Sequence, residues 1–171
     1  MLAKLLLGLS VFTATAWSTP GQGCGKVNVF YTGLPAYHPI SRASGIDPAE
    51  LDAGLRNGTE AMIKAGYNVR MVLAGPEQDI SRLKSRMDGI DWQVTGIGYG
   101  VRASKTHEMI IRFEDLIKLF NTIPNAPIVF NYGADDLVWL VQHRLPILRN
   151  CTEHPGELLG YEEICDEICD H

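Results

Sequence analysis

The stretch Val27–Tyr31, with the sequence VNVFY, determines how the rest of this chain is interpreted. It is rich in β-branched and aromatic residues and it is followed by Gly33, so it is predicted to be a buried first strand. A helix is then expected over Pro48–Ala65, because Asp47 suits the cap before it, its first residue is a proline, and Gly66 suits its end. A strand followed by a helix indicates the first unit of a parallel sheet.

Three more strand–helix pairs follow this first one. Strands are expected over residues 68–74, 92–97 and 126–132, and helices over 77–87, 105–121 and 135–143. Four such units predict an α/β three-layer sandwich, with a four-stranded parallel sheet of order 2-1-3-4 and helices on both faces, as in flavodoxin-like and Rossmann-like folds. In the third helix, the apolar stripe expected to face the core is Ile110, Phe113, Ile117 and Phe120.

Three short motifs in the second half of the chain can be read together. They are GYGVR at Gly98–Arg102, FEDLI at Phe113–Ile117 and VFN at Val129–Asn131. The combination resembles an uncharacterised family of small α/β proteins from bacteria and fungi, in which a glycine-containing turn follows one strand and the next strand ends in Phe-Asn. The resemblance implies a Rossmann-like or flavodoxin-like fold with a candidate pocket. It implies no reaction, since that family has no established activity.

The N-terminus has the pattern of a secretory signal peptide over residues 1–16. Lys4 precedes an apolar run over residues 5–14, and the small residues Ala14 and Ala16 predict cleavage before Trp17. The apolar run is shorter than the roughly 20 residues that a membrane span needs, so no membrane span is expected. We therefore expect a secreted, extracellular protein, with an α/β domain over 17–146 and a cysteine-containing acidic tail over 147–171.

Cysteines and acceptor sequons support the expectation of export. All four cysteines lie beyond the cleavage site, and an even number in an exported chain predicts disulfides, in one of three pairings. A bridge between Cys24 and Cys151 is reasonable because they flank the predicted domain, whereas a metal is not expected because Cys165 and Cys169 lack a second close pair of ligands. Glycosylation sequons occur at two asparagines, Asn57 and Asn150.

Charge and motifs exclude several classes of function. The net charge of −5 argues against a nucleic-acid partner, which would require a clustered basic face. The glycines of residues 96–100 lack the spacing of a dinucleotide fingerprint, and the chain has no P-loop, no nucleophile elbow of the α/β-hydrolases and no zinc-protease motif. No cofactor is therefore expected.

The candidate site lies where ligands bind in open parallel sheets, beyond the carboxyl ends of the first and third strands. The loop after the third strand contains Gly98, Gly100, Arg102 and Lys105 just before a helix, which suits a carboxylate or phosphate. The same residues would also suit a tight turn with solvated charges. His38 and His107, one on each of the two loops, are weak candidates for catalytic acid and base.

Two functions follow from these observations. The first is a secreted, non-enzymatic binding or accessory module, such as an effector, whose partner is a small anionic ligand or a host or extracellular protein. The alternative is a small enzyme that acts on an anionic or carbonyl-containing metabolite in the pocket between strands one and three. The enzyme requires His38, His107 and Arg102 to converge on one cleft.

Overall fold

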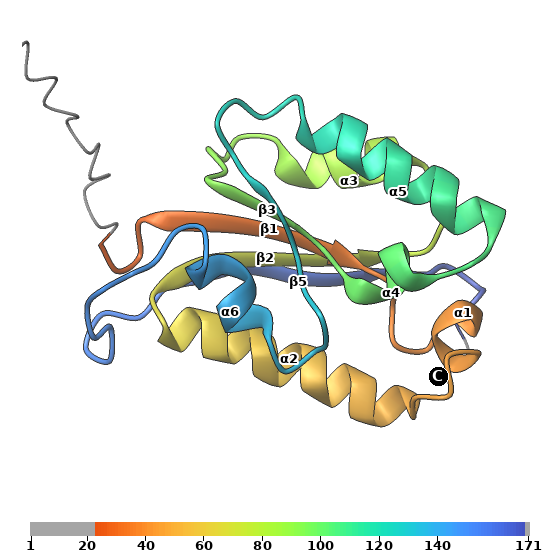
Figure 1. Ribbon diagram of the computed structural model, residues 1–171, viewed down its shortest axis with the longest axis horizontal. Coiled ribbons are helices and arrows are strands. Elements are labelled where there is room, and N and C mark those ends of the chain that lie inside the picture. Colours follow the sequence, from red (N-terminus) through yellow and green to blue (C-terminus); the bar gives the residue numbers. More distant parts are fainter. Residues whose placement is uncertain (1–22, 170–171) are drawn as a thin grey trace, which may run out of the picture.

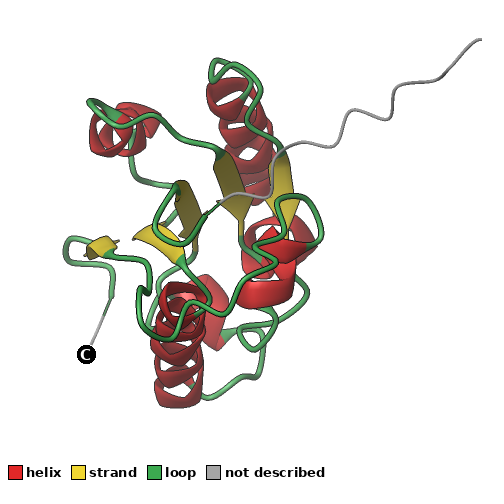
Figure 2. Ribbon diagram, turned by 90° about the vertical axis from the view of Figure 1, so that its left-hand side faces the viewer, coloured by secondary structure: helices red, strands yellow, loops and turns green. Residues whose placement is uncertain are grey.

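The structure is a computed structural model that describes residues 23–169. It is a parallel α/β fold of the flavodoxin-like or Rossmann-like type, with one five-stranded, all-parallel sheet between two layers of helices (Figures 1 and 2). The strand order is β4-β3-β1-β2-β5. The strands are β1 Val27–Gly33, β2 Tyr67–Ala74, β3 Val94–Ile97, β4 Ile128–Phe130 and β5 Leu158–Ile164.

The described part of the chain contains six helices. They are α1 Pro39–Arg42, α2 Pro48–Lys64, α3 Ile80–Met87, α4 Tyr99–Ala103, α5 His107–Phe120 and α6 Leu137–Gln142. Helices α2 and α6 lie on one face, and α3 and α5 lie on the other (Figure 1). The start of α2 is as expected, because the Asp47 carboxylate accepts hydrogen bonds from the backbone N–H groups of Ala49 and Glu50.

The central strand β1 is buried on both faces, which explains its nearly continuous apolar sequence. Val29 and Tyr31 pack into the core under α2 and α6. Phe30 points to the opposite core, where its ring contacts Trp92 and Phe120 edge-on, with centroids 5.4 and 6.0 Å apart. The two faces of β1 therefore belong to two separate hydrophobic cores.

The predicted order of the first four strands is confirmed, but the count of four is wrong. The predicted tail supplies a fifth strand, β5, which pairs in parallel with β2 and places Tyr161 beside Met71. Its sequence, LLGYEEI, has an interior glycine and two glutamates, so its apolar pattern is too weak to indicate a strand. The pairing is reinforced by tertiary contact, because the Arg70 guanidinium donates hydrogen bonds to the Leu159 carbonyl at 3.1 and 2.8 Å.

Two local expectations are also corrected. In α5 the buried residues are Met109, Arg112, Leu116 and Phe120. Ile110, expected in the core, is 47% exposed, because the face of α5 that packs on the sheet contains Met109 and Arg112, and Arg112 donates to the loop after β2. The loop expected over 98–106 is in part the short helix α4, which buries Val101 against the sheet.

Two disulfides lie near the two ends of the described residues. Cys24 pairs with Cys151, as the sequence suggested, and Cys165 pairs with Cys169. No helix within residues 23–169 has the length and apolar character needed to cross a membrane. The predicted signal peptide and its cleavage site lie outside the described residues.

Candidate functional site

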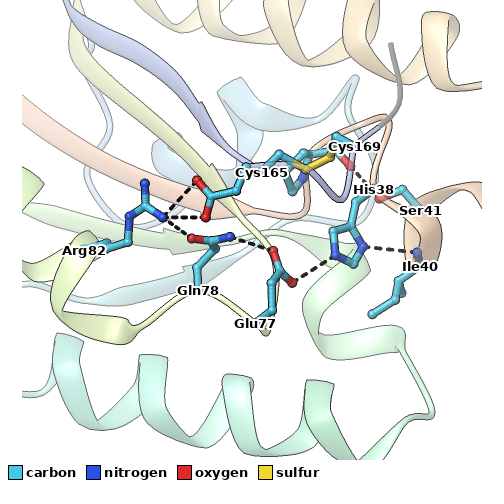
Figure 3. Close-up of a disulfide and its surroundings, with 10 residues drawn as sticks. His38, Ile40, Ser41, Glu77, Gln78, Arg82, Cys165 and Cys169 are labelled. Carbon is cyan, nitrogen blue, oxygen red and sulfur yellow. Dashed lines mark hydrogen bonds and ion pairs between the residues drawn. A yellow bond between two sulfur atoms is a disulfide. The ribbon is translucent and has the colours of Figure 1, made fainter.

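Side chains from three loops and from the first turn of α3 meet at the carboxyl ends of β1, β2 and β5 (Figure 3). They form a hydrogen-bonded chain in the order His38, Glu77, Gln78, Arg82 and Asp166, and we call this group the carboxyl-edge chain. The Cys165–Cys169 disulfide lies beside it in Figure 3. This is the part of a parallel α/β sheet at which ligands usually bind.

Both ring nitrogens of His38 have hydrogen-bond partners. Its side chain is only 2% exposed, its Nδ1 accepts a hydrogen bond from the Ile40 backbone N–H at 3.1 Å, and its Nε2 lies 3.1 Å from Glu77 Oε2. A neutral imidazole that accepts at Nδ1 and donates at Nε2 satisfies both contacts. His38 therefore caps α1 and orients Glu77, and neither ring nitrogen is left to act as an acid or base.

Glu77 is held between two donors. Gln78 Nε2 donates to its Oε1 at 3.0 Å, while His38 contacts its Oε2. Burial raises the pKa of the Glu77 carboxyl, but the hydrogen bonds from Gln78 and His38 outweigh burial and leave this pKa below its ordinary value. Gly75 permits this approach, because a Cβ there would lie 2.6 Å from His38 Nε2.

Arg112 is a buried charge that the sequence interpretation missed. It is 4% exposed and its guanidinium donates to the backbone carbonyls of Gly75 and Gln78 from α5. Burial lowers its pKa, and the nearby Glu77 carboxylate partly opposes that effect. A signal was present, since Arg112 follows Met109 by three residues and precedes Leu116 by four, which is the spacing of the core stripe.

Arg102, one of the predicted anion-binding residues, contacts a backbone carbonyl and an aromatic ring. Arg102 lies on α4, where its Nη2 donates to the Asn131 carbonyl at 2.8 Å and its guanidinium lies over the Tyr99 ring, 5.1 Å from the centroid. The Tyr99 ring in turn contacts Tyr132, at 6.3 Å between centroids. We call Tyr99, Arg102 and Tyr132 the aromatic–arginine patch.

The glycines and the other basic residues have separate surroundings. Gly98 lets the ends of β1 and β3 approach, because a Cβ there would lie 2.9 Å from the Tyr31 hydroxyl and 3.1 Å from Gly33 Cα. Gly100, Lys105 and His107 are exposed. His38 is bound to Glu77 and Arg102 to Asn131, so the structure does not join the predicted residues in a common set of contacts.

Two open depressions lie elsewhere on the described surface. One, of about 570 Å³, lies between α3 and β5 and is lined by Arg70, Arg86 and Tyr161 among others. In it, Arg86 already pairs with Glu162 through two bonds of 3.0 and 2.7 Å. The second, of about 330 Å³, lies between the ends of α3 and α5. Neither includes His38, His107 or Arg102.

The sequons and possible metal ligands can be placed as well. Asn57 and Asn150 are both exposed, Asn57 on α2 and Asn150 in the loop before Cys151. The Asn150 side-chain oxygen accepts a hydrogen bond from the Thr152 backbone N–H at 2.9 Å. Over residues 23–169, no group of three or more His, Cys, Asp or Glu side chains is arranged to hold a metal ion.

Comparison with protein-family models, with curated proteins and with solved structures gives no match. The parallel α/β fold is therefore established by the sheet itself, and no family is identified. Any functional conclusion has to come from the arrangement of this chain's own residues.

Proposed function

We propose that this protein is an exported, non-enzymatic binding module that recognises an acidic segment of an extracellular protein. The contact surface is the aromatic–arginine patch at the carboxyl ends of β3 and β4. The observation that carries the proposal is the exposure of two contacting tyrosines beside an arginine. Tyr99 is 44% exposed and Tyr132 is 78% exposed. Tyrosine and arginine are the residue types most enriched at the energetic centres of protein interfaces.

The arginine is prepared for a carboxylate. One bond to the Asn131 carbonyl and the stacking on Tyr99 hold the guanidinium of Arg102 in place, which reduces the entropy lost on binding. Its other N–H groups have no protein partner among the described residues, and a carboxylate matches their planar geometry. Lys105 follows as an exposed cation, and the nearby Asp136 carboxylate already accepts hydrogen bonds from the backbone N–H groups of Tyr132 and Gly133. A carboxylate of the partner would therefore pair with Arg102 and Lys105.

Export is supported by the signal pattern of residues 1–16 and by the two disulfides. Disulfides persist in oxidising compartments and are rare in the cytosol. The enzyme alternative has no support from the positions of the candidate residues, because both nitrogens of His38 are already bonded and the described depressions lie away from Arg102.

Selection of 12-residue peptides from a displayed random library tests the proposal. Peptides selected on the wild-type protein are expected to combine Asp or Glu with apolar residues, and Arg102→Ala should weaken their binding by about 1.5 to 3 kcal/mol, the scale of a hydrogen bond to a charged group. The matched control is Arg144→Ala, another exposed arginine, which lies beyond the end of α6 and should leave binding unchanged.

Tyr132→Ala should also weaken the binding of these peptides. The melting temperature should barely change in Arg102→Ala or in Tyr132→Ala. The proposal is wrong if the selected peptides show no acidic preference, or if Arg102→Ala and Arg144→Ala bind them equally well.

A further inference from the structure

We propose that the Cys165–Cys169 disulfide is an exchangeable redox site that can be reduced by a small thiol while the domain stays folded. This inference is independent of the aromatic–arginine patch. It rests on the different positions of the two disulfides in the chain and on what the smaller one holds in place.

The two disulfides contribute very differently to the fold. Cys24 and Cys151 are 127 residues apart in sequence, whereas Cys165 and Cys169 are four apart. The restriction of the unfolded chain by a disulfide grows with the length of the closed loop, so opening the small ring costs the fold much less than opening the large one. Reduction at Cys165–Cys169 is therefore compatible with a native sheet.

The surroundings of the two disulfides also differ. Cys151 belongs to the main core under α2 and packs so closely on Gly66 that a Cβ there would lie 2.5 Å from its sulfur. The small ring follows the last strand and belongs to neither core cluster. Cys165 and Cys169 are themselves buried, and residues 166–168 between them are exposed. A local opening of the chain after β5 exposes both Cys165 and Cys169. In the long-range disulfide Cys151 lies in the core, so a thiolate can approach this bond only from the side of the half-buried Cys24.

The small ring positions a charged group. Asp166 has a left-handed backbone, with φ of 45°, a conformation that aspartate adopts more readily than most residues with a Cβ. In this conformation its carboxylate contacts Arg82 Nη1 at 3.2 and 2.9 Å, and Arg82 continues the carboxyl-edge chain to Gln78 (Figure 3). Opening the ring releases Asp166 from this conformation, so reduction is coupled to the contact between β5 and α3.

The exchange is a balanced two-step reaction. The thiolate of a small dithiol attacks one sulfur of the pair, the Cys165–Cys169 bond breaks, and the second protein sulfur leaves as a thiolate that takes a proton. The reductant's other thiolate then attacks the mixed disulfide, which releases the oxidised reductant and the second protein thiol. The protein gains two electrons and two protons, and the dithiol loses both.

Graded reduction of the full chain with dithiothreitol, followed by alkylation and peptide mass spectrometry, tests this. Cys165 and Cys169 should be labelled faster than Cys24 and Cys151, on the order of tenfold or more. The melting temperature of this selectively reduced form should fall by roughly 4 to 8 °C, against roughly 14 to 28 °C when the long-range disulfide is lost as well. Simultaneous labelling of all four cysteines would overturn the proposal.

A double variant, Cys165→Ala with Cys169→Ala, separates the ring from the reagent. It should fold, and its amide hydrogen exchange should rise at residues 165–169 and in the first turn of α3, with no change in β1. Asp166→Asn, which keeps the ring, should raise exchange in α3 alone. Failure of the double variant to fold, or unchanged exchange in α3 in both variants, would contradict the proposal.

Discussion

At the residue scale, the chemistry of this protein is decided by which polar atoms are already bonded. His38 has the residue type and position expected of a catalytic base, yet the Ile40 N–H and the Glu77 carboxylate occupy both of its nitrogens. Arg112, in the middle of α5, instead holds the loop after β2 by donating hydrogen bonds to two of its backbone carbonyls. A sequence identifies ionisable residues, but some of their hydrogen-bond partners, such as Glu77 for His38 and the Gly75 carbonyl for Arg112, come from segments far away along the chain.

The contact between His38 and Glu77 predicts how stability changes with pH. The pKa of Glu77 lies below its ordinary value of 4.5 in the folded protein. Its contribution is therefore present above that value and is lost as pH falls through the folded pKa. Glu77→Gln should lower the free energy of unfolding by about 1 to 2 kcal/mol at pH 7, and should make the decline in stability between pH 5 and pH 3 less steep.

Urea titrations of the wild type and the variant over this pH range provide the measurement. Glu114→Gln, which removes the same charge from an exposed position of α5, is the control and should behave like the wild type. A variant with unchanged stability at pH 7 would show that the bond between His38 and Glu77 contributes nothing to the fold.

At the element scale, the packing of α2 against α6 depends on one glycine. A Cβ at Gly58 would lie 2.6 Å from the Ala134 carbonyl oxygen and 2.7 Å from Leu137 Cδ1. Gly58→Ala should force α6 away from α2 and destabilise the protein by about 1 to 3 kcal/mol, despite the higher helix propensity of alanine. The control is Gly100→Ala in α4, where the nearest atom, Leu34 Cδ1, is 3.4 Å away, so the change should be close to neutral. Equal melting temperatures for the two variants would contradict this prediction.

Strand β5 gives a second prediction at this scale. A chain that ends at Glu157 lacks β5 and leaves the β2 edge unpaired, so we expect it to aggregate or to lose its cooperative unfolding transition. A chain that ends at Ile164 keeps the strand and loses only the Cys165–Cys169 ring, so it should remain folded and monodisperse. Circular dichroism and size-exclusion chromatography distinguish the two outcomes. A stable, monomeric protein ending at Glu157 would show that residues 158–171 are dispensable for the fold.

At the scale of the whole molecule, export and disulfide formation are linked. The chain is expected to lose residues 1–16 and to form its disulfides outside the cytosol. Intact-mass analysis of the protein secreted from an expressing culture should give an N-terminus near Trp17 and four oxidised cysteines. Recovery of the protein in the cytosol with Met1 intact would contradict the prediction of a signal peptide.

The sequence by itself determined the four strand–helix units and the order of their strands, but not the short helices α1 and α4. The Val27–Tyr31 run, the cap at Asp47 and the alternation of strands with helices depend on neighbours in sequence, and the structure confirms them. The cysteine positions also suggested the bridge between Cys24 and Cys151. These features were predictable because short-range periodicity, capping and chain connectivity restrict them strongly.

Only the tertiary structure decided the fifth strand, the orientation of α5 and the composition of the candidate site. The weak pattern of residues 158–164 becomes a strand because β2 offers it an unpaired edge. Helix α5 buries Arg112, which donates to the carbonyls of Gly75 and Gln78, and exposes Ile110. Asp166 joins Arg82 from 84 residues away. These outcomes depend on hydrogen bonds between distant segments, whose energies no local pattern encodes.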